Sequence, residues 1–262
     1  MTRFKFKIIT LSFSLLLISV VPSLGAGLGG ELLKVDWSFK GITGKFDRAS
    51  LQRGFQVYKE VCSSCHSMQY LSYRNLGEPG GPEFSEQEVK AIAASVEIED
   101  GPDSQGEMFI RAGRPADKFK SPYSNVNASI AANGGAYPPD MSVLVKARPG
   151  GSNYIYSVLM GYEDPPEGMN LDDGVYYNKY MIGNKIKMSS PLSDEIVEYT
   201  DGTQATVDQM AKDVTTFLTW TAEPELEERH RTGVKVIIYL ILLTTLVYLS
   251  MKKVWSRIDT EV

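Results

Sequence analysis

The sequence predicts a mainly α-helical domain with long loops, followed by one C-terminal transmembrane helix. Three observations predict this fold class. Several segments place apolar residues at helical spacing, Gly- and Pro-rich stretches separate these segments, and an apolar run lies near the C-terminus. A chain of 262 residues is long enough for one large domain with such additions.

The first element is a signal peptide, which we place at residues 1–25. Three basic residues precede a mostly apolar run over residues 8–21, and small residues at 23–25 fit a signal-peptidase site. A transmembrane helix is the alternative, but the run is short for a hydrocarbon core about 30 Å thick, and Pro22 ends it. The sequence therefore predicts export of the domain that follows, residues 26–228.

Four segments of this domain have the apolar spacing of helices. They are residues 51–61, 84–96, 153–160 and 206–221. Asp47 or Ser50 can cap the first helix, and Ser85 can cap the second. Thr206 and Gln209 fit a capping box at the start of the last helix.

The segments between these helices are long. Residues 100–149 and 161–193 are rich in turn-forming residues and predict irregular structure. Loops of this length are uncommon unless they have a function or wrap around something. They leave too little regular core for this chain length, unless a bound group fills the interior.

A second apolar run covers residues 234–250 and has one charge, Lys235, at its edge. Its length approaches the roughly 20 residues that a membrane-spanning helix needs. A buried core helix is the alternative, but the short charged tail that follows offers no element to cover it. We predict an acidic linker at 223–228, a transmembrane anchor at 229–251 and a cytoplasmic tail at 252–262, with the signal peptide placing the domain outside.

The chemistry-bearing motif is Cys62-Ser63-Ser64-Cys65-His66. A Cys-x-x-Cys-His motif attaches haem through two thioether bonds and presents its histidine to the iron. A redox dithiol would need a strand-helix-strand context, and a zinc site would need further Cys or His ligands. Cys62 and Cys65 are the only cysteines of the chain. We therefore predict one covalent haem c, which would also fill the interior, with His66 as an iron ligand.

The candidates for the sixth iron ligand can be reduced in number by elimination. The only other histidine, His230, lies next to the membrane span, so a second imidazole ligand would need this segment to fold back over the haem. A methionine thioether is the usual alternative, and it raises the haem potential relative to a second imidazole. Ten methionines are present, and spacing excludes Met1, Met68 and Met251 but does not choose among the others.

The motif and its surroundings resemble the cytochrome c1 family. The resemblance starts at Arg53-Gly54-Phe55-Gln56-Val57-Tyr58 and includes Cys62 to Met68. It continues through 100–102, 106–109, 132–135, 138–140, 147–151, 161–162, 201–203 and 211–214 to the C-terminal anchor. It implies a cytochrome c-like haem domain that forms the haem subunit of the ubiquinol:cytochrome c oxidoreductase, or cytochrome bc1 complex.

The resemblance also implies a sixth ligand. In the family this ligand lies in a Met-x-x-Pro segment, which matches Met188-Ser189-Ser190-Pro191 and selects Met188 beside His66. Family members more often have Met-Ala-Pro-Pro here, and some carry an additional cysteine pair. This chain has no such pair, so the loop around Tyr162 must be held by packing alone.

Four further residues are assigned to the haem by the resemblance. Arg148 matches an arginine beside a haem propionate, a position that suits an always-charged planar donor. Pro139 matches a proline packed against the haem on the histidine side, where a backbone carbonyl could hold the His66 ring. Asn133 and Tyr154 match polar positions at the haem edge.

The implied function is electron transfer. The haem would accept an electron from the Rieske iron-sulfur protein and pass it to a soluble or membrane-bound c-type cytochrome in a proton-translocating respiratory chain. Cytochrome b would be a further partner within a dimeric complex. We place the chain in the bacterial inner membrane as a single-pass protein with its haem domain in the periplasm.

Charge and ligation exclude some functions. The net charge of -5 argues against a nucleic-acid partner, which requires a basic patch. Two filled axial positions leave no open site for oxygen or peroxide, so we expect no independent catalytic site on this chain. A haem enzyme or gas sensor in which Met188 leaves the iron is one alternative. A membrane-bound cytochrome that serves an oxidase is the other.

Overall fold

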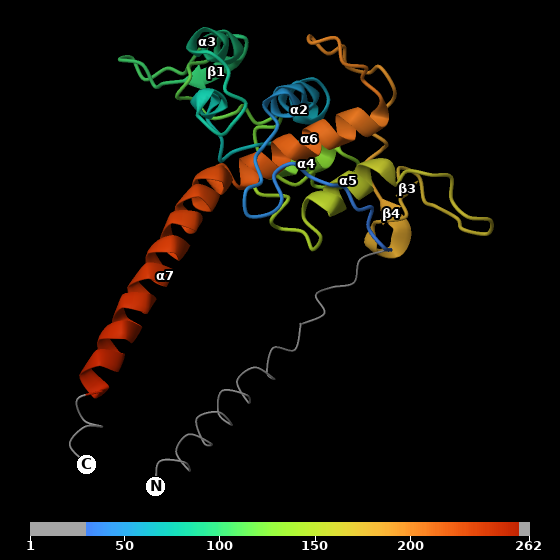
Figure 1. Cartoon of the computed structure of the whole chain (residues 1–262). Coiled ribbons are helices and arrows are strands. Elements are labelled where there is room, and N and C mark those ends of the chain that lie inside the picture. Colours follow the sequence, from blue (N-terminus) through green and yellow to red (C-terminus); the bar gives the residue numbers. More distant parts are fainter. Residues whose placement is uncertain (1–29, 257–262) are drawn as a thin grey trace.

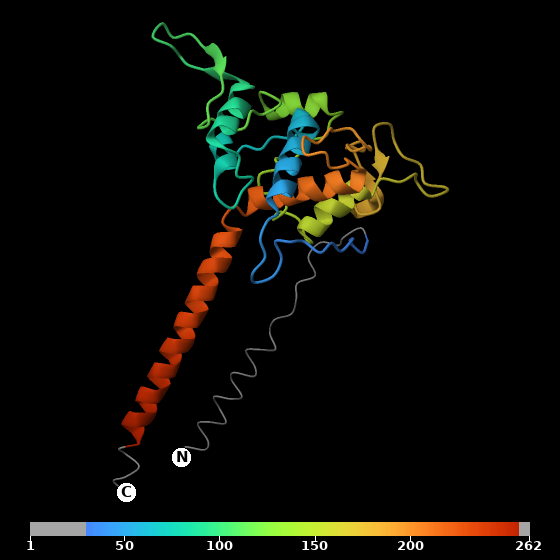
Figure 2. The same ribbon diagram turned by 45° about the horizontal axis from the view of Figure 1, so that its top comes forward.

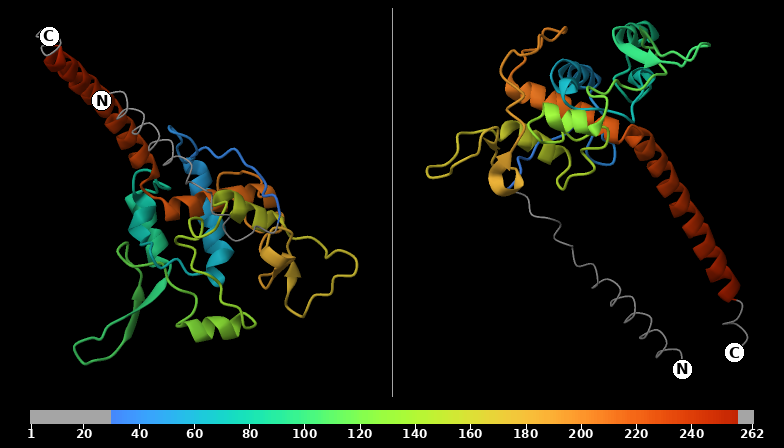
Figure 3. Two further views of the ribbon diagram at one scale, coloured as in Figure 1. Left: turned by 90° about the horizontal axis from the view of Figure 1, so that it is seen from below. Right: turned by 180° about the vertical axis from the view of Figure 1, so that it is seen from behind.

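The computed structural model describes residues 30–256 of the chain (Figure 1). The predicted signal peptide, residues 1–25, and the end of the predicted tail, residues 257–262, lie outside the described residues. A helical domain lies at one end of a single long helix, which projects away from it in every view (Figures 1 and 3). The mainly α fold class is confirmed.

The described residues form helices joined by long loops, with two short antiparallel hairpins. The helices are α2 (Arg48–Glu60), α3 (Glu86–Ala94), α4 (Val126–Ala132), α5 (Ser152–Met160), α6 (Val207–Ala222) and α7 (Leu226–Trp255). Single 3-10 turns are η1 (Cys62–Ser64), η2 (Tyr73–Gly77) and η3 (Ile182–Asn184). Strand β1 (Glu97–Asp100) pairs with β2 (Phe109–Ala112), and β3 (Tyr176–Tyr177) pairs with β4 (Lys185–Ile186).

The core is built on the crossing of α2 and α6. Gly54 makes this crossing possible, because a Cβ there would lie 2.1 Å from the Asp213 carbonyl oxygen. Phe217 is fully buried at the crossing, and its ring lies 5.7 Å from that of Phe55 and 5.9 Å from that of Tyr58. The close packing of α6 therefore sets the direction in which α2 delivers the motif at its C-terminal end.

A buried carboxylate fastens the same crossing. Asp213 is fully buried, and it accepts hydrogen bonds from Ser50 Oγ at 2.7 Å, Arg53 Nε at 2.8 Å and Gln209 Nε2 at 3.0 Å. A buried carboxylate is tolerated only when its oxygens are paired in this way. The hydrogen bond to Asp213 also raises the pKa of Arg53, so the guanidinium stays charged.

Two sides of α2 carry different parts of the domain (Figure 2). Helix α3 and the β1–β2 hairpin lie on one side, whereas α5 and the β3–β4 hairpin lie on the other (Figures 2 and 3). Helix α5 packs on α6, where Ser152 Oγ and Thr219 Oγ1 are 3.0 Å apart.

The helix caps follow the local sequence. Asp47, not Ser50, caps α2, and its carboxylate accepts from the Ala49 amide at 3.0 Å. Ser85 and Glu88 form a capping box at α3. Thr206 accepts from the Gln209 amide at 3.2 Å. The reciprocal half of this capping box is missing, because the Gln209 side chain donates to Asp213 instead.

The structure is more regular than expected between residues 100 and 149. Helix α3 ends at Ala94, not at residue 96, because the chain turns into β1, whose Glu97 faces Ala112 of β2. Arg111 of β2 holds the hairpin base through two hydrogen bonds to the Asp117 carboxylate, at 2.6 and 2.9 Å. The pairing of β1 with β2 joins two separate segments of the chain, so the periodicity of either strand alone did not predict it.

The connection to the long helix is shorter than predicted. Helix α6 ends at Ala222, because Pro224 disfavours helical geometry at Glu223, and α7 begins at Leu226. The predicted linker at 223–228 thus has only three residues outside helices. The predicted anchor at 229–251 is the inner part of α7, which continues to Trp255.

Helix α7 has the length and composition of a membrane span. Its most apolar window has a mean hydropathy of 2.1, and none of that window is buried against the rest of residues 30–256. Its first turn is fastened to the domain by Glu227, which accepts from Arg48 at 2.8 and 2.9 Å and from the Phe46 amide at 2.8 Å. The domain and the helix are therefore joined through side chains as well as through the connecting residues.

Candidate functional site

The cysteine motif forms a tight turn at the C-terminal end of α2. The amide nitrogens of Cys65 and His66 both donate to the Cys62 carbonyl oxygen, at 3.2 and 2.9 Å. The two intervening serines turn back onto the helix, with Ser63 Oγ bonded to the Lys59 carbonyl at 2.7 Å and Ser64 Oγ to the Val61 carbonyl at 2.9 Å. This turn keeps both thiols and the imidazole within one short segment.

Cys62 and Cys65 form no disulfide and are each partly exposed as residues, but the Cys62 thiol itself is buried. Burial raises the pKa of the Cys62 thiol to about 12, and the neighbouring Cys65 adds to this effect. Dithiols with redox function have the opposite property, a thiol pKa below its usual value. The environment of Cys62 therefore disfavours the redox-dithiol interpretation.

His66 is buried and oriented by a backbone carbonyl. Its Nδ1 lies 2.8 Å from the Pro139 carbonyl oxygen, which can only accept a hydrogen bond. The proton is therefore on Nδ1, and the Nε2 lone pair is available to a metal. Burial lowers the pKa of His66, against the opposing effect of the Pro139 bond, so the imidazole is held neutral, as a metal ligand must be.

The loop that supplies this carbonyl is clamped to the motif by Asp140. Its carboxylate accepts from Ser67 Oγ at 2.7 Å, the Gln69 amide at 2.9 Å and the Ser142 amide at 2.8 Å. Burial acts to raise the pKa of Asp140, but the hydrogen bonds from Ser142, Gln69 and Ser67 outweigh it and lower the pKa. This role of Asp140 is not evident from the sequence, because Ser67 and Gln69 lie 73 and 71 residues away along the chain.

Met188 follows strand β4 and is partly buried against the core. Its carbonyl oxygen accepts a hydrogen bond from the Tyr162 hydroxyl at 3.1 Å. The preceding residue, Lys187, donates from Nζ to the Gly134 carbonyl at 3.1 Å. The loop over residues 133–139 is thus bonded to Lys187 near one end and to the His66 ring at the other.

The remaining predicted residues have separate contacts. Arg148 is exposed, and its guanidinium donates to the Ala147 carbonyl at 3.1 Å. Asn133 caps the end of α4 and donates to the Ser129 carbonyl at 2.7 Å. Tyr154 is buried in α5, with its hydroxyl 3.1 Å from the sulfur of Met181. Within residues 30–256, no hydrogen bond joins Arg148, Asn133 or Tyr154 to His66 or Met188.

The second histidine is engaged elsewhere. His230 lies on α7, and its Nδ1 is 3.2 Å from the Gly44 carbonyl oxygen at the junction of the helix with the domain. This position agrees with the expectation that His230 does not pair with His66 at a metal.

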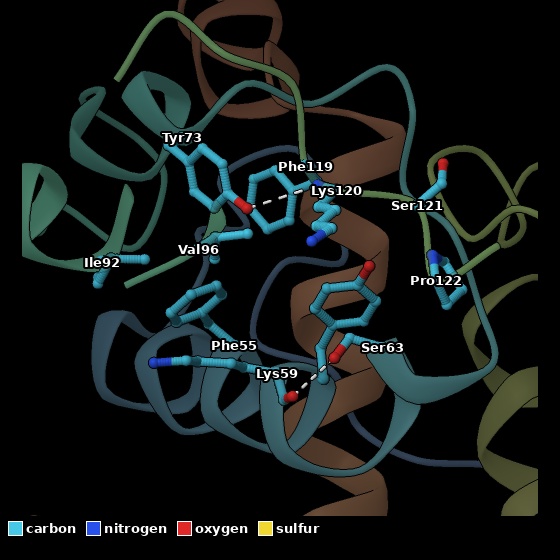
Figure 4. Close-up of a pocket in the computed structure, with 11 residues that line it drawn as sticks. Phe55, Lys59, Ser63, Tyr73, Ile92, Val96, Phe119, Lys120, Ser121 and Pro122 are labelled. Carbon is cyan, nitrogen blue, oxygen red and sulfur yellow. Dashed lines mark hydrogen bonds between the residues drawn. The ribbon is translucent and has the colours of Figure 1, made fainter. Parts of the chain in front are cut away.

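A cavity of about 220 Å³ lies beside the motif and touches it only at Ser63 (Figure 4). It is enclosed by α2, η2, α3 and residues 119–122, and its wall is mainly aromatic and aliphatic. Ser63 is the one motif residue in this wall; Cys62, His66 and Met188 are not among the lining residues. The cavity is therefore distinct from the ligand set.

The residues of the motif and its surroundings fit a covalently bound haem c. Cys62 and Cys65 supply two free thiols one turn apart, and the hydrogen bond from His66 to Pro139 leaves a nitrogen lone pair for iron. Arg148 has an exposed guanidinium that can pair with a carboxylate. Two thiols for covalent attachment, with an imidazole and a thioether as possible iron ligands, are the groups that a haem c requires.

Comparison with known proteins gives a consistent result. The family model described as "Cytochrome C1 family" matches residues 37–258. A "Cytochrome c1" of Rhodospirillum rubrum is 46% identical over 246 residues, which cover 88% of this chain and 89% of that protein. A "Cytochrome b-c1 complex catalytic subunit, mitochondrial" of Candida albicans is 48% identical over 223 residues, covering 85% and 74%.

One relative is much longer than this chain. A "Cytochrome b/c1" of Bradyrhizobium diazoefficiens is 51% identical over 239 residues, which cover 84% of this chain. The match spans only 35% of that relative.

Proposed function

The chain belongs to the cytochrome c1 family, and we propose that it is the electron-relaying haem subunit of a cytochrome bc1 complex. The observation that carries the proposal is the His66 ring, held by the Pro139 carbonyl with Nε2 free, directly after two free thiols. The names of the Candida and Bradyrhizobium relatives, which join cytochromes b and c1, support the placement in this complex.

In this proposal, Cys62 and Cys65 hold one haem c through thioether bonds. His66 Nε2 and the Met188 sulfur would ligate the haem iron. Haem c supplies one-electron oxidation and reduction at its iron when bound. Arg148 would pair with a propionate, Pro139 would pack against the haem on the histidine side, and Asn133 and Tyr154 would contact its edge.

The chain's own residues suit a relay better than a catalyst. The Pro139 bond fixes the tautomer and the orientation of His66, and the Asp140 clamp fixes the loop that carries Pro139. A thioether ligand raises the haem potential relative to a second imidazole. With His66 and Met188 both bound to the iron, no coordination position would remain for oxygen or peroxide. We therefore expect no independent catalytic site on this chain.

The proposed membrane arrangement is supported by α7, which is long and apolar enough for a span, and by the predicted signal peptide. The helix anchors the chain once in the bacterial inner membrane, the haem domain lies in the periplasm, and residues after the span face the cytoplasm. Electrons pass from a Rieske iron-sulfur protein to a soluble or membrane-bound c-type cytochrome. Cytochrome b is the membrane partner, within a dimeric complex.

Purification of the complex through a tag on this chain tests the proposal. We expect a c-type haem that remains attached to the chain under denaturing conditions, together with cytochrome b and a Rieske protein. The purified complex should reduce a c-type cytochrome with a quinol as donor. Recovery of the haem chain without cytochrome b and the Rieske protein would overturn the placement in a bc1 complex.

The alternative of a haem enzyme or gas sensor has a separate readout. The ferrous complex should not bind carbon monoxide at neutral pH, because Met188 occupies the sixth position. Ready binding of carbon monoxide by the unmodified protein would contradict a sealed electron relay.

A further inference from the structure

The segment that carries Met188 is weakly held. Met188 is flanked by Lys187, Ser189 and Ser190, which are all exposed. Within the described part of the chain, the main chain of Met188 has one hydrogen bond, from the Tyr162 hydroxyl to its carbonyl at 3.1 Å. A thioether at this position therefore depends on few contacts for its placement.

Tyr162, by contrast, belongs to a well-packed frame at the end of α5. It forms an antiparallel bridge with Asn178, and the Lys179 amide donates to the Gly161 carbonyl at 3.1 Å. The Asn178 side chain is fully buried and donates to the Val158 carbonyl at 2.7 Å. These bonds hold the backbone of Tyr162 in place.

Gly161 shows how tightly this frame is packed. A Cβ at Gly161 would lie 2.6 Å from the Tyr180 ring and 2.7 Å from Asn178 Oδ1. Only glycine allows the end of α5 to approach Asn178 and Tyr180 so closely. The hydroxyl of Tyr162 is therefore presented from a rigid backbone to a segment that is otherwise loosely held.

We propose that Tyr162 is a positioning residue for Met188, which it fixes through the main-chain carbonyl so that the thioether stays on the haem iron. The inference rests on the proposed function, since it takes Met188 as the sixth ligand. It replaces the expectation that packing alone holds the loop around Tyr162.

The physical basis is a shift in a two-state equilibrium. A thioether is a neutral ligand and competes with its own dissociated state, in which the loop gains conformational freedom. Loss of one hydrogen bond of ordinary strength changes such an equilibrium about 3- to 10-fold. Tyr162 thereby sets the fraction of ligated haem, and with it the potential and the access of external ligands.

Replacement of the hydroxyl in the intact complex tests this inference. Tyr162→Phe should keep the haem attached, lower its midpoint potential, and raise the dissociated fraction about 3- to 10-fold, read as carbon monoxide binding by the ferrous protein. Tyr176→Phe is the matched control. Tyr176 lies on β3, in the β3–β4 hairpin that precedes Met188, but it is 42% exposed. The control should retain the potential of the unmodified protein.

Two outcomes would overturn the inference. One is a Tyr162→Phe complex with unchanged potential and no carbon monoxide binding. The other is a loss of haem content in which the remaining haem keeps its normal potential, because this would show a merely structural role. The potential is measured per haem, so it does not depend on how much complex assembles.

Met188→Lys separates this inference from the proposed function. If this variant keeps its potential, then Met188 is not the ligand and the ligand assignment itself is wrong. If Met188→Lys lowers the potential and Tyr162→Phe does not, then only the role of Tyr162 is wrong.

Discussion

The two proposed iron ligands are held in different ways. His66 lies within the turn that ends α2, where its amide is bonded to Cys62, its ring to Pro139 and its carbonyl to Tyr58. Met188 follows a two-residue strand, and its main chain has a single hydrogen bond within the described residues. His66 is fixed both by its neighbours along the chain and by the loop that carries Pro139, whereas Met188 lies in a segment with few hydrogen bonds.

This difference indicates which of the two proposed iron ligands is more easily lost. On the histidine side, the Asp140 clamp adds two hydrogen bonds between the 66–70 segment and the loop that carries Pro139. Movement of His66 would break several of these contacts together. Movement of Met188 would break one main-chain hydrogen bond and its packing against the core, so loss of a ligand should occur on the methionine side.

The largest effect is expected from the histidine side. His66→Ala should reduce covalently bound haem to a small fraction of normal, because both the ligand and the bond to Pro139 are lost and the core then lacks its bound group. Haem staining of the chain, normalised to the amount of protein, measures this. Normal haem content in this variant would contradict the view that the histidine side anchors the site.

A substitution on the methionine side should act differently. Met188→Lys should leave the haem attached and lower its potential on the order of 0.1 V or more, since axial ligands set haem potentials over a range of about 0.8 V. Redox titration of the purified complex measures the potential. Haem content as low as that of His66→Ala would remove the distinction between the two sides.

The smallest effect is expected from Asp140→Asn, which weakens the clamp but keeps both ligands. Ser67 and Gln69 donate to one carboxylate oxygen and the Ser142 amide to the other, whereas an amide side chain has only one accepting oxygen. One side of the clamp is therefore lost, and we expect a loss of about 1–3 kcal/mol in the free energy of unfolding. The haem potential should change less than in Met188→Lys. Thermal unfolding followed by haem absorbance, with redox titration of the same sample, measures both quantities.

The unmodified protein and Asp140→Asn should also differ in how their stability depends on pH. The pKa of Asp140 is lowered in the folded state, so its stabilising contribution is complete above the unfolded pKa of about 3.9. It is lost as the pH falls through the lower folded pKa. The stability difference between the unmodified protein and Asp140→Asn should therefore shrink below about pH 4, and a difference that stays constant would exclude Asp140 as its source.

Interactions between residues close together in the sequence allowed the motif, two helix starts and the apolar helix to be predicted. The Cys-x-x-Cys-His motif needs only five consecutive residues to indicate haem attachment, and the starts of α2 and α3 follow from Asp47 and Ser85, whose hydrogen bonds span at most three residues. The apolar run of α7 is likewise a property of one segment. Met188, however, was selected by family resemblance, because spacing could not choose among the methionines.

By itself, the sequence determined the helices with strong caps, the motif and the apolar anchor, since each depends on interactions between near neighbours. The tertiary structure decided which carbonyl orients His66, which carboxylate clamps that loop and which hydroxyl holds Met188. The partners in these bonds lie between 26 and 73 residues apart. No periodicity records such pairings, because they arise only when the packing of α2 on α6 and of α5 on α6 brings the loops together.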